Sequence, residues 1–294
     1  MEGEIIHFQT SDYIKLSGIL YKAKTNNKKI LISTHGMATD CLKYRDEKIA
    51  EEIEKIQTDM LVYNNRGKEI ISYIKTEKGE KKLGGTAFED VEESYYDIVG
   101  AIEFAKKQGY KEIYLMGHSL GATKTVYTYN KLIDENKKEI LENIKGIILL
   151  SLVDIPTATR IYLNERFPEI LTYAKNMERE KMENILMPEK TFIHPISVKT
   201  FLKYARDYQK IDFARYSEKE YNFETLNKIE VPLMMRWGNV NELILQKPED
   251  LCKMLNEKIT NTKKDIGYID GANHSYTNKE QELAENIRKF LENN

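Results

Sequence analysis

The chain carries the sequence EIYLMGHSLG at residues 112–121, and this stretch decides the expected fold. Its first five residues form a short apolar run, which is typical of a strand buried on both faces of a parallel sheet. Ser119 then follows between Gly117 and Gly121, which gives the spacing G-x-S-x-G. Glycines two residues to either side of the serine leave room for a sharp turn, because side chains there would collide with the neighbouring strand and helix.

The residues after this turn continue as an amphipathic helix. Apolar side chains recur along its buried face at Ala122, Val126, Tyr129 and Ile133. A serine between a strand and a helix projects its hydroxyl above the sheet, and the N-terminus of the helix points its free N–H groups at a developing oxyanion. We therefore predict that Ser119 is a catalytic nucleophile.

A histidine near the end of the chain has a matching position. His274 follows the last expected strand, at residues 265–270, and precedes a terminal helix that starts near residue 278. A base at this point can swing over the carboxyl end of the sheet and reach Ser119. We predict that His274 is the general base.

The rest of the chain alternates between strand and helix patterns. Further buried strands are expected at residues 29–34, 59–64, 146–151 and 231–237. This alternation predicts an α/β fold with a mostly parallel central sheet and helices on both faces. The polar, lysine-rich segment 67–85 is expected to be a loop.

The alternation stops between residues 155 and 228. This segment has helical patterning without a clear buried strand, and it is rich in tyrosine and phenylalanine. We predict a core made of residues 1–154 and 229–294, with 155–228 inserted as a helical cap or lid. Its aromatic side chains are expected to form the core of the cap or to line a substrate pocket.

These motifs together resemble the α/β-hydrolase superfamily of serine esterases. The matching segments are His35-Gly36, Asn65-Arg66-Gly67, the serine motif and residues 271–274. The resemblance implies an oxyanion hole formed by backbone N–H groups, and its positions correspond here to Met37 and Leu120. It also implies a carboxylate that orients the catalytic histidine.

The position usual for that carboxylate holds no acid. It lies three residues beyond a glycine, and counting from Gly238 leads to Asn241, which cannot carry the charge. Glu242 is the first alternative, because its longer side chain can reach back. Asp154 is the second, since an acid at the end of the neighbouring strand is a known variation in the superfamily. Each also has a plain alternative: Glu242 as a surface residue, and Asp154 as a helix N-cap.

Composition restricts the partners and the compartment. Lys and Arg number 45 against 47 for Asp and Glu, so the net charge of −2 offers no attraction to nucleic acid. Two cysteines, no signal peptide and no apolar run long enough to span a membrane favour a cytoplasmic location without a membrane partner. The five histidines lack metal-ligand spacing, so no metal or other cofactor is expected.

The expected activity is that of a serine hydrolase, carboxylesterase-like, which cleaves a small to medium ester through an acyl-enzyme. Two alternatives stay open: a peptidase or amidase that uses the same nucleophile, and a binding protein with degraded chemistry, which Asn241 suggests. The sequence gives no indication of the oligomeric state.

Overall fold

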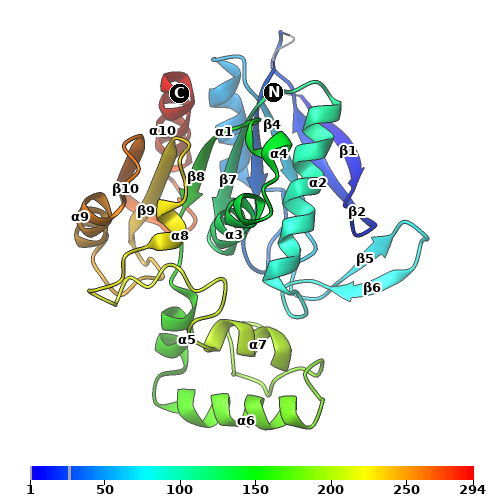
Figure 1. The fold of residues 1–294 in the computed structure, drawn as a ribbon, viewed down its shortest axis with the longest axis vertical. Coiled ribbons are helices and arrows are strands. Elements are labelled where there is room, and N and C mark those ends of the chain that lie inside the picture. The colour runs from blue at the N-terminus through cyan, green and yellow to red at the C-terminus, as the bar shows by residue number, and fades with distance from the viewer. Residues whose placement is uncertain (1, 26–27) are drawn as a thin grey trace.

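The computed structural model describes residues 2–25 and 28–294, and its centre is a single mixed β-sheet (Figure 1). The ten strands of this described part run in the order β10-β9-β8-β7-β3-β4-β2-β5-β6, and β1 pairs with β2. The segment from β10 to β4 is parallel, and the pairs that involve β1, β2, β5 and β6 are antiparallel. The strands are β1 (Gly3–Gln9), β2 (Ile14–Tyr21), β3 (Lys29–Thr34), β4 (Asp59–Tyr63), β5 (Ser72–Thr76), β6 (Lys81–Gly84), β7 (Glu112–His118), β8 (Ile144–Leu150), β9 (Leu233–Val240) and β10 (Lys264–Asn273).

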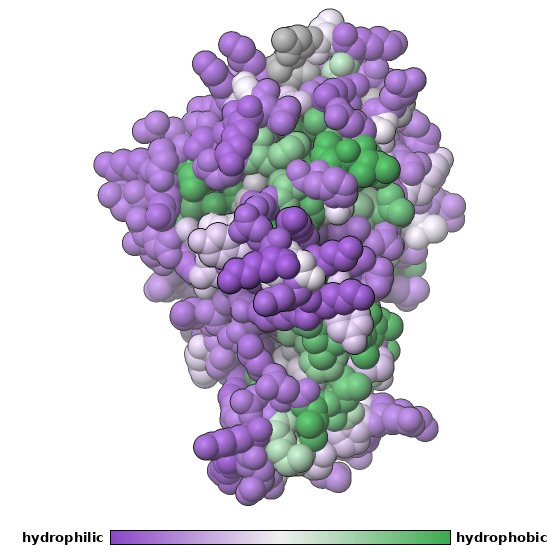
Figure 2. All heavy atoms as spheres, turned by 90° about the vertical axis from the view of Figure 1, so that its right-hand side faces the viewer, coloured by the Kyte–Doolittle hydropathy of each residue, from purple (hydrophilic) through white to green (hydrophobic). Residues whose placement is uncertain are grey.

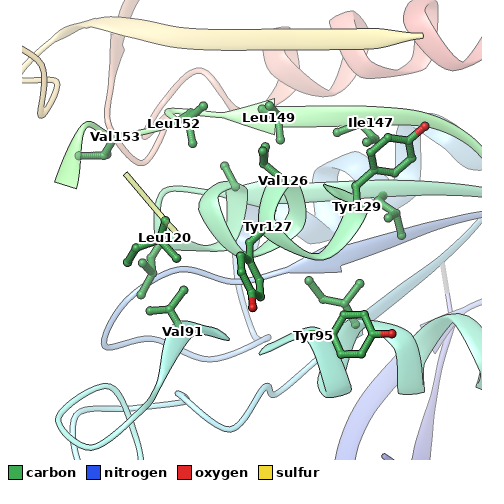
Figure 3. Close-up of a cluster of buried hydrophobic side chains, with 14 of the residues drawn as sticks. Val91, Tyr95, Leu120, Val126, Tyr127, Tyr129, Ile147, Leu149, Leu152 and Val153 are labelled. Carbon is green, nitrogen blue, oxygen red and sulfur yellow. The ribbon is translucent and has the colours of Figure 1, made fainter. Parts of the chain in front are cut away.

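Helices cover both faces of this sheet, which confirms the expected α/β class. One apolar cluster joins the sheet to α1 (Tyr44–Glu54) and α10 (Glu280–Asn293), and a second joins the other face to α2 (Ser94–Lys107), α3 (Leu120–Asp134) and α9 (Pro248–Lys258). Figure 3 shows the second cluster where Val126 and Tyr129 of α3 lie beside Ile147 and Leu149 of β8. Because β7 and β8 are buried on both faces, they read in the sequence as continuous apolar runs.

The expectation of a loop at residues 67–85 is wrong for residues 72–76 and 81–84. Here β5 and β6 pair as an antiparallel hairpin, and Gly79 lies in the turn with φ of 81°. Along β5 the side chains of Ser72 and Ile74 are buried, whereas Tyr73 and Lys75 face solvent. A strand near the sheet edge that has one face in solvent carries polar residues at alternate positions. These polar residues are also typical of loops, which is why the sequence pattern predicted a loop here.

The segment between β8 and β9 is helical. It holds α5 (Ile155–Leu163), α6 (Phe167–Arg179), α7 (Val198–Ala205) and the short α8 (Glu224–Asn227). Figure 1 shows α5, α6 and α7 as a separate layer beyond the end of the sheet at which β7 and β8 finish. Several aromatic side chains are buried within this segment, namely Phe201, Tyr204, Phe213, Tyr216 and Phe223.

Several large apolar side chains are exposed at the surface. Ile5, Tyr73 and Leu83 are exposed on the antiparallel side of the sheet, and Met182 and Leu186 on the segment between β8 and β9. The view in Figure 2 shows apolar surface on the upper and lower parts of this face, separated by a hydrophilic band. Within residues 2–25 and 28–294, no helix has the length and apolarity needed to cross a bilayer.

Candidate active site

Ser119 occupies the sharp turn between β7 and α3. Its backbone has φ of 56° and ψ of −125°, a conformation that non-glycine residues rarely adopt and that functional sites often contain. The Ser119 N–H donates to the carbonyl of Leu150, 2.8 Å away, which ties the turn to the neighbouring strand β8. A Cβ on Gly117 would clash with the backbone of Gly121, and one on Gly121 with the carbonyl of Thr34. The two glycines of the motif are therefore required by close backbone approach.

His274 lies directly after β10 and reaches this serine. Its Nε2 lies 3.0 Å from Oγ of Ser119, and its Nδ1 lies 2.8 Å from Oε2 of Glu242. The side chain of Glu242 is 3% exposed, against 20% for His274, so the carboxylate is shielded while the imidazole remains accessible. A hydroxyl, an imidazole and a carboxylate thus form one chain of hydrogen bonds.

The backbone before Glu242 explains how this carboxylate reaches the histidine. Asn241 has φ of 52°, in the left-handed region that asparagine tolerates better than most residues. Oε1 of Glu242 then accepts hydrogen bonds from the Gly238 N–H at 2.8 Å and from Oγ of Ser151 at 2.6 Å. Burial raises the pKa of Glu242, but the hydrogen bonds from His274, Ser151 and Gly238 outweigh it, so the pKa lies below its usual value.

Asp154, the second expected alternative, is placed elsewhere. It is the N-cap residue of α5, and its Oδ1 accepts a hydrogen bond from the Thr157 N–H at 3.1 Å. Within the described part of the chain it forms no hydrogen bond with His274, and burial raises its pKa. The structure therefore brings Glu242, and not Asp154, to the imidazole.

The two amides expected at the oxyanion hole lie on adjoining segments. A Cβ built on Gly36 would lie 2.9 Å from the carbonyl oxygen of His118, 3.1 Å from Cβ of Ser119 and 3.6 Å from the Leu120 nitrogen. The segment that carries Met37 therefore packs directly against the serine turn, and Gly36 permits this approach. In the part of the chain that the structure describes, the N–H groups of Met37 and Leu120 donate no hydrogen bond.

Two residues that the sequence did not single out support the imidazole and the carboxylate. His118 donates from Nε2 to the backbone carbonyl of His274 at 2.7 Å, and their ring centroids lie 5.0 Å apart. Ser151, at the end of β8, donates to Glu242 as described above. A serine at the end of a strand is common, so its role is visible only once the chain is folded.

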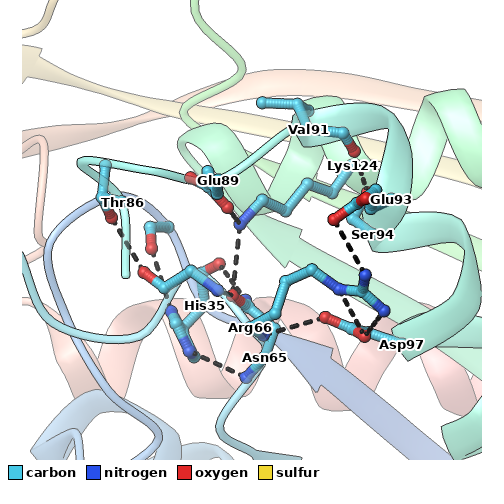
Figure 4. A network of polar contacts seen from close by, with 12 residues as sticks. His35, Asn65, Arg66, Thr86, Glu89, Val91, Glu93, Ser94, Asp97 and Lys124 are labelled. Carbon is cyan, nitrogen blue, oxygen red and sulfur yellow. Dashed lines mark hydrogen bonds and ion pairs between the residues drawn. The ribbon is translucent and has the colours of Figure 1, made fainter. Parts of the chain in front are cut away.

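A buried polar network contacts His35, which directly precedes Gly36 and Met37 (Figure 4). The ammonium group of Lys124, on α3, is fully buried and lies 2.6 Å from Oε2 of Glu89 and 3.2 Å from Oδ1 of Asn65. The Asn65 N–H in turn donates to Nε2 of His35 at 3.1 Å. Arg66 forms a second buried ion pair, 2.8 Å from Asp97. The Asn65-Arg66-Gly67 motif therefore fixes the loop that carries the expected oxyanion donor.

Two cavities meet at Ser119. One, of about 240 Å³, is lined mainly by apolar side chains, among them Leu120, Val153, Tyr162, Phe192 and Leu243. The other, of about 300 Å³, is lined mostly by residues that carry a polar or charged group, among them Thr39, Lys43 and Arg45, and also by Gly36 and Met37. Met37, Ser119 and His274 line both cavities. A molecule bound at Ser119 can therefore extend in two chemically different directions.

Comparison with known protein families shows to which family the chain belongs. The sequence of residues 84–292 matches DUF1749, a family described as a protein of unknown function. The chain belongs to the DUF1749 family. The matched region begins at the end of β6 and runs through Ser119, Glu242 and His274 into α10.

Solved structures similar to this DUF1749 chain share its fold over almost the whole length. Est1E from Butyrivibrio proteoclasticus with bound ferulic acid is 18% identical, with a TM-score of 0.66 over 97% of this chain and 98% of that chain. The α/β hydrolase GrgF from Penicillium sp. is 15% identical, with a TM-score of 0.68 over 100% and 99%. A soluble variant of monoglyceride lipase from Saccharomyces cerevisiae, in complex with a substrate analog, is 14% identical, with a TM-score of 0.65 over 100% and 96%. This DUF1749 chain therefore has the α/β-hydrolase fold. No curated protein matches it.

Proposed function

We propose that this chain is a serine hydrolase that cleaves a carboxylic ester of small to medium size through an acyl-enzyme. One observation carries the proposal: the hydrogen-bonded chain from Ser119 Oγ through the His274 ring to Glu242, with links of 3.0 and 2.8 Å. These are the distances at which a base can take the proton of a nucleophile while a third group orients the base.

In the first half of the reaction Ser119 is acylated. His274 takes the hydroxyl proton at Nε2 while Oγ attacks the ester carbonyl carbon, and Glu242 stabilises the imidazolium through the Nδ1–H bond. The carbonyl oxygen becomes an oxyanion, which the unpaired N–H groups of Met37 and Leu120 bind. His274 then gives the proton to the departing alkoxide, and the alcohol leaves.

In the second half water releases the acid. His274 removes a proton from a water molecule that attacks the acyl carbon, and the oxyanion forms at the same two amides. Its collapse breaks the bond to Oγ of Ser119, which regains its proton from His274. The balance is one ester and one water for one acid and one alcohol, and no cofactor takes part in these steps.

The segment 155–228, the expected cap, contributes part of the wall of the apolar cavity. Tyr162, Phe192 and Ile193 belong to the segment 155–228 and line the apolar cavity together with Leu120 and Val153 of the core. We assign the acyl group to this cavity, where the cap would shield it and the oxyanion site from water. Two of the structural neighbours, Est1E with bound ferulic acid and a monoglyceride lipase with a substrate analog, are consistent with acyl substrates.

Turnover of two substrate series tests the proposal. We expect p-nitrophenyl esters with acyl chains of two to eight carbons to be hydrolysed, and the activity to disappear in Ser119→Ala. Aminoacyl p-nitroanilides serve as the contrasting series. Faster turnover of the anilides would replace the esterase assignment by a peptidase or amidase, and inactivity toward both series would favour a binding protein.

A further inference from the structure

The polar cavity beside Ser119 contains a buried guanidinium group with few partners. Arg45 is 7% exposed, and its Nε donates to Oδ1 of Asp46 at 3.0 Å. Its other two nitrogens, Nη1 and Nη2, form no hydrogen bond with any residue in the described part of the chain. A guanidinium carries five N–H donors, and buried donors are almost always satisfied in folded proteins. Four donors of Arg45 are thus available on the wall of a cavity that also contains the nucleophile.

A second cation lies next to Arg45. Lys43 lines the same cavity, is partly buried, and forms no ion pair with the residues that the structure describes. It is also the N-cap residue of α1, a position where no side chain caps the helix. In the described residues the N–H groups of Tyr44 and Arg45, at the start of this helix, donate no hydrogen bond, and the positive end of the helix dipole lies there.

The positive charge of Arg45 acts on His118, whose ring donates to the backbone carbonyl of His274. Burial, and after it the positive charge of Arg45, lowers the pKa of His118 well below its usual value, so this ring is neutral. One carboxylate, that of Glu280 at the start of α10, lines the same cavity and opposes the field. Lys43, Arg45 and Glu280 are the charged Lys, Arg and Glu side chains that line the cavity, and the Asp46 carboxylate, outside the lining, pairs with Nε of Arg45. In the described residues, Nη1 and Nη2 of Arg45 and the first N–H groups of α1 are the donors at this cavity that remain without an acceptor.

Resting on the function proposed above, we propose that this polar cavity binds an anionic group, a carboxylate or a phosphate, on the alcohol half of the ester. The apolar cavity takes the acyl half, and the two cavities meet at Ser119 and His274, where the carbonyl carbon must lie. Arg45 is suited to a forked pair of hydrogen bonds with two oxygens of the anion, and Lys43 adds a point charge.

A matched pair of esters tests this inference. 4-Carboxyphenyl butanoate carries an anion on its alcohol half, and its methyl ester is neutral and of similar shape. The ratio of their kcat/KM values is measured for each protein variant, so that the intrinsic reactivity of the two substrates cancels. We expect the ratio to fall about tenfold in Arg45→Gln, which can retain the bond to Asp46, and about threefold in Lys43→Met. We expect it to rise two- to threefold in Glu280→Gln.

A cation far from the cavity provides the control. Lys111→Met removes an exposed cation at the opposite end of β7 and is expected to leave the ratio unchanged. Thermal unfolding of each variant separates a loss of fold from a loss of selectivity, and Lys43→Met removes no side-chain hydrogen bond or ion pair among the described residues. A ratio that stays within twofold of wild type in all three cavity variants would overturn the proposal.

A binding experiment keeps this inference separate from the proposed reaction. Ser119→Ala protein is titrated with 4-hydroxybenzoate, with 4-hydroxybenzamide and with inorganic phosphate. We expect the two anions to bind at least tenfold more tightly than the neutral amide and to lose this advantage in the Ser119→Ala, Arg45→Gln double variant. Equal binding of anion and amide contradicts the anion site, whereas absence of ester turnover with selective anion binding contradicts only the esterase function. Tighter binding of phosphate than of the carboxylate would identify a phosphate as the natural group.

Discussion

Nε2 of His274 lies 3.0 Å from Oγ of Ser119, although 155 positions separate the two residues in the chain. The parallel sheet produces this proximity, because Ser119 follows the C-terminal end of β7 and His274 follows that of β10, and these ends lie at the same edge. Nε2 of His118 donates to the backbone carbonyl of His274 and so anchors the main chain that carries the imidazole.

Replacing the carboxylate next to His274 should reduce turnover strongly. We expect Glu242→Gln to lower kcat for p-nitrophenyl butanoate by about 10²–10⁴, because the amide cannot stabilise the imidazolium. Asp154→Asn is the matched control, since Asp154 caps α5 and does not contact the imidazole. A larger loss in Asp154→Asn than in Glu242→Gln would show that the acid has been assigned to the wrong residue.

A methyl group on Gly36 should displace the segment that carries Met37, the proposed oxyanion donor. The added carbon would lie 2.9 Å from the His118 carbonyl, so the segment that carries Met37 must shift away from Ser119. We expect Gly36→Ala to lower kcat by about 10²–10³, the cost of one lost oxyanion donor, with a smaller change in KM. Gly267→Ala is the control, because its nearest neighbour lies 3.5 Å away, and it should retain nearly full activity. Equal losses in the two variants would indicate a general effect on stability.

The buried pair of Lys124 and Glu89 should contribute to stability as a unit. Both side chains are at most 1% exposed, so Lys124→Met leaves the Glu89 carboxylate without its cation. We expect this variant to lose about 3–5 kcal/mol of unfolding free energy, and Lys124→Met with Glu89→Leu to recover part of the loss. Urea unfolding of the two single variants and the double variant measures the coupling. Additive losses would show that the two residues act independently.

Stability should fall as the solution becomes acidic, partly because of His35. Burial, and then the charge of Lys124, lowers the pKa of His35 to about 3, whereas the unfolded chain has the ordinary value of 6.5. Below pH 6.5 the unfolded state therefore binds a proton at His35, whereas the folded state leaves this ring neutral. The free energy of unfolding consequently decreases with falling pH until about pH 3. Each such histidine contributes a slope of up to about 1.4 kcal/mol per pH unit. We expect His35→Gln to flatten the pH dependence of the unfolding free energy between pH 6 and 4, and an unchanged slope would refute this.

The sequence predicts which strands carry Ser119 and His274 better than it predicts the hydrogen-bond partners around them. Ser119 and His274 each follow a recognisable buried strand, so their positions at one edge of the sheet can be inferred. The reach of Glu242 depends on the left-handed backbone of Asn241, which no pattern of residue types reveals. Ser151 and Arg45 are ordinary residues in the sequence, and only the folded chain places them at Glu242 and at the polar cavity. The hairpin β5–β6 was missed because its solvated face carries the polar residues of a loop.

Covalent labelling with a fluorophosphonate tests the central claim most directly, because the reagent requires a serine activated by a neighbouring base. The account predicts that intact-mass measurement finds one adduct per chain, that peptide mapping places it on Ser119, and that Ser119→Ala and His274→Ala abolish it. Absence of an adduct on the wild-type protein, or an adduct that persists in Ser119→Ala, would contradict the claim that Ser119 is an activated nucleophile.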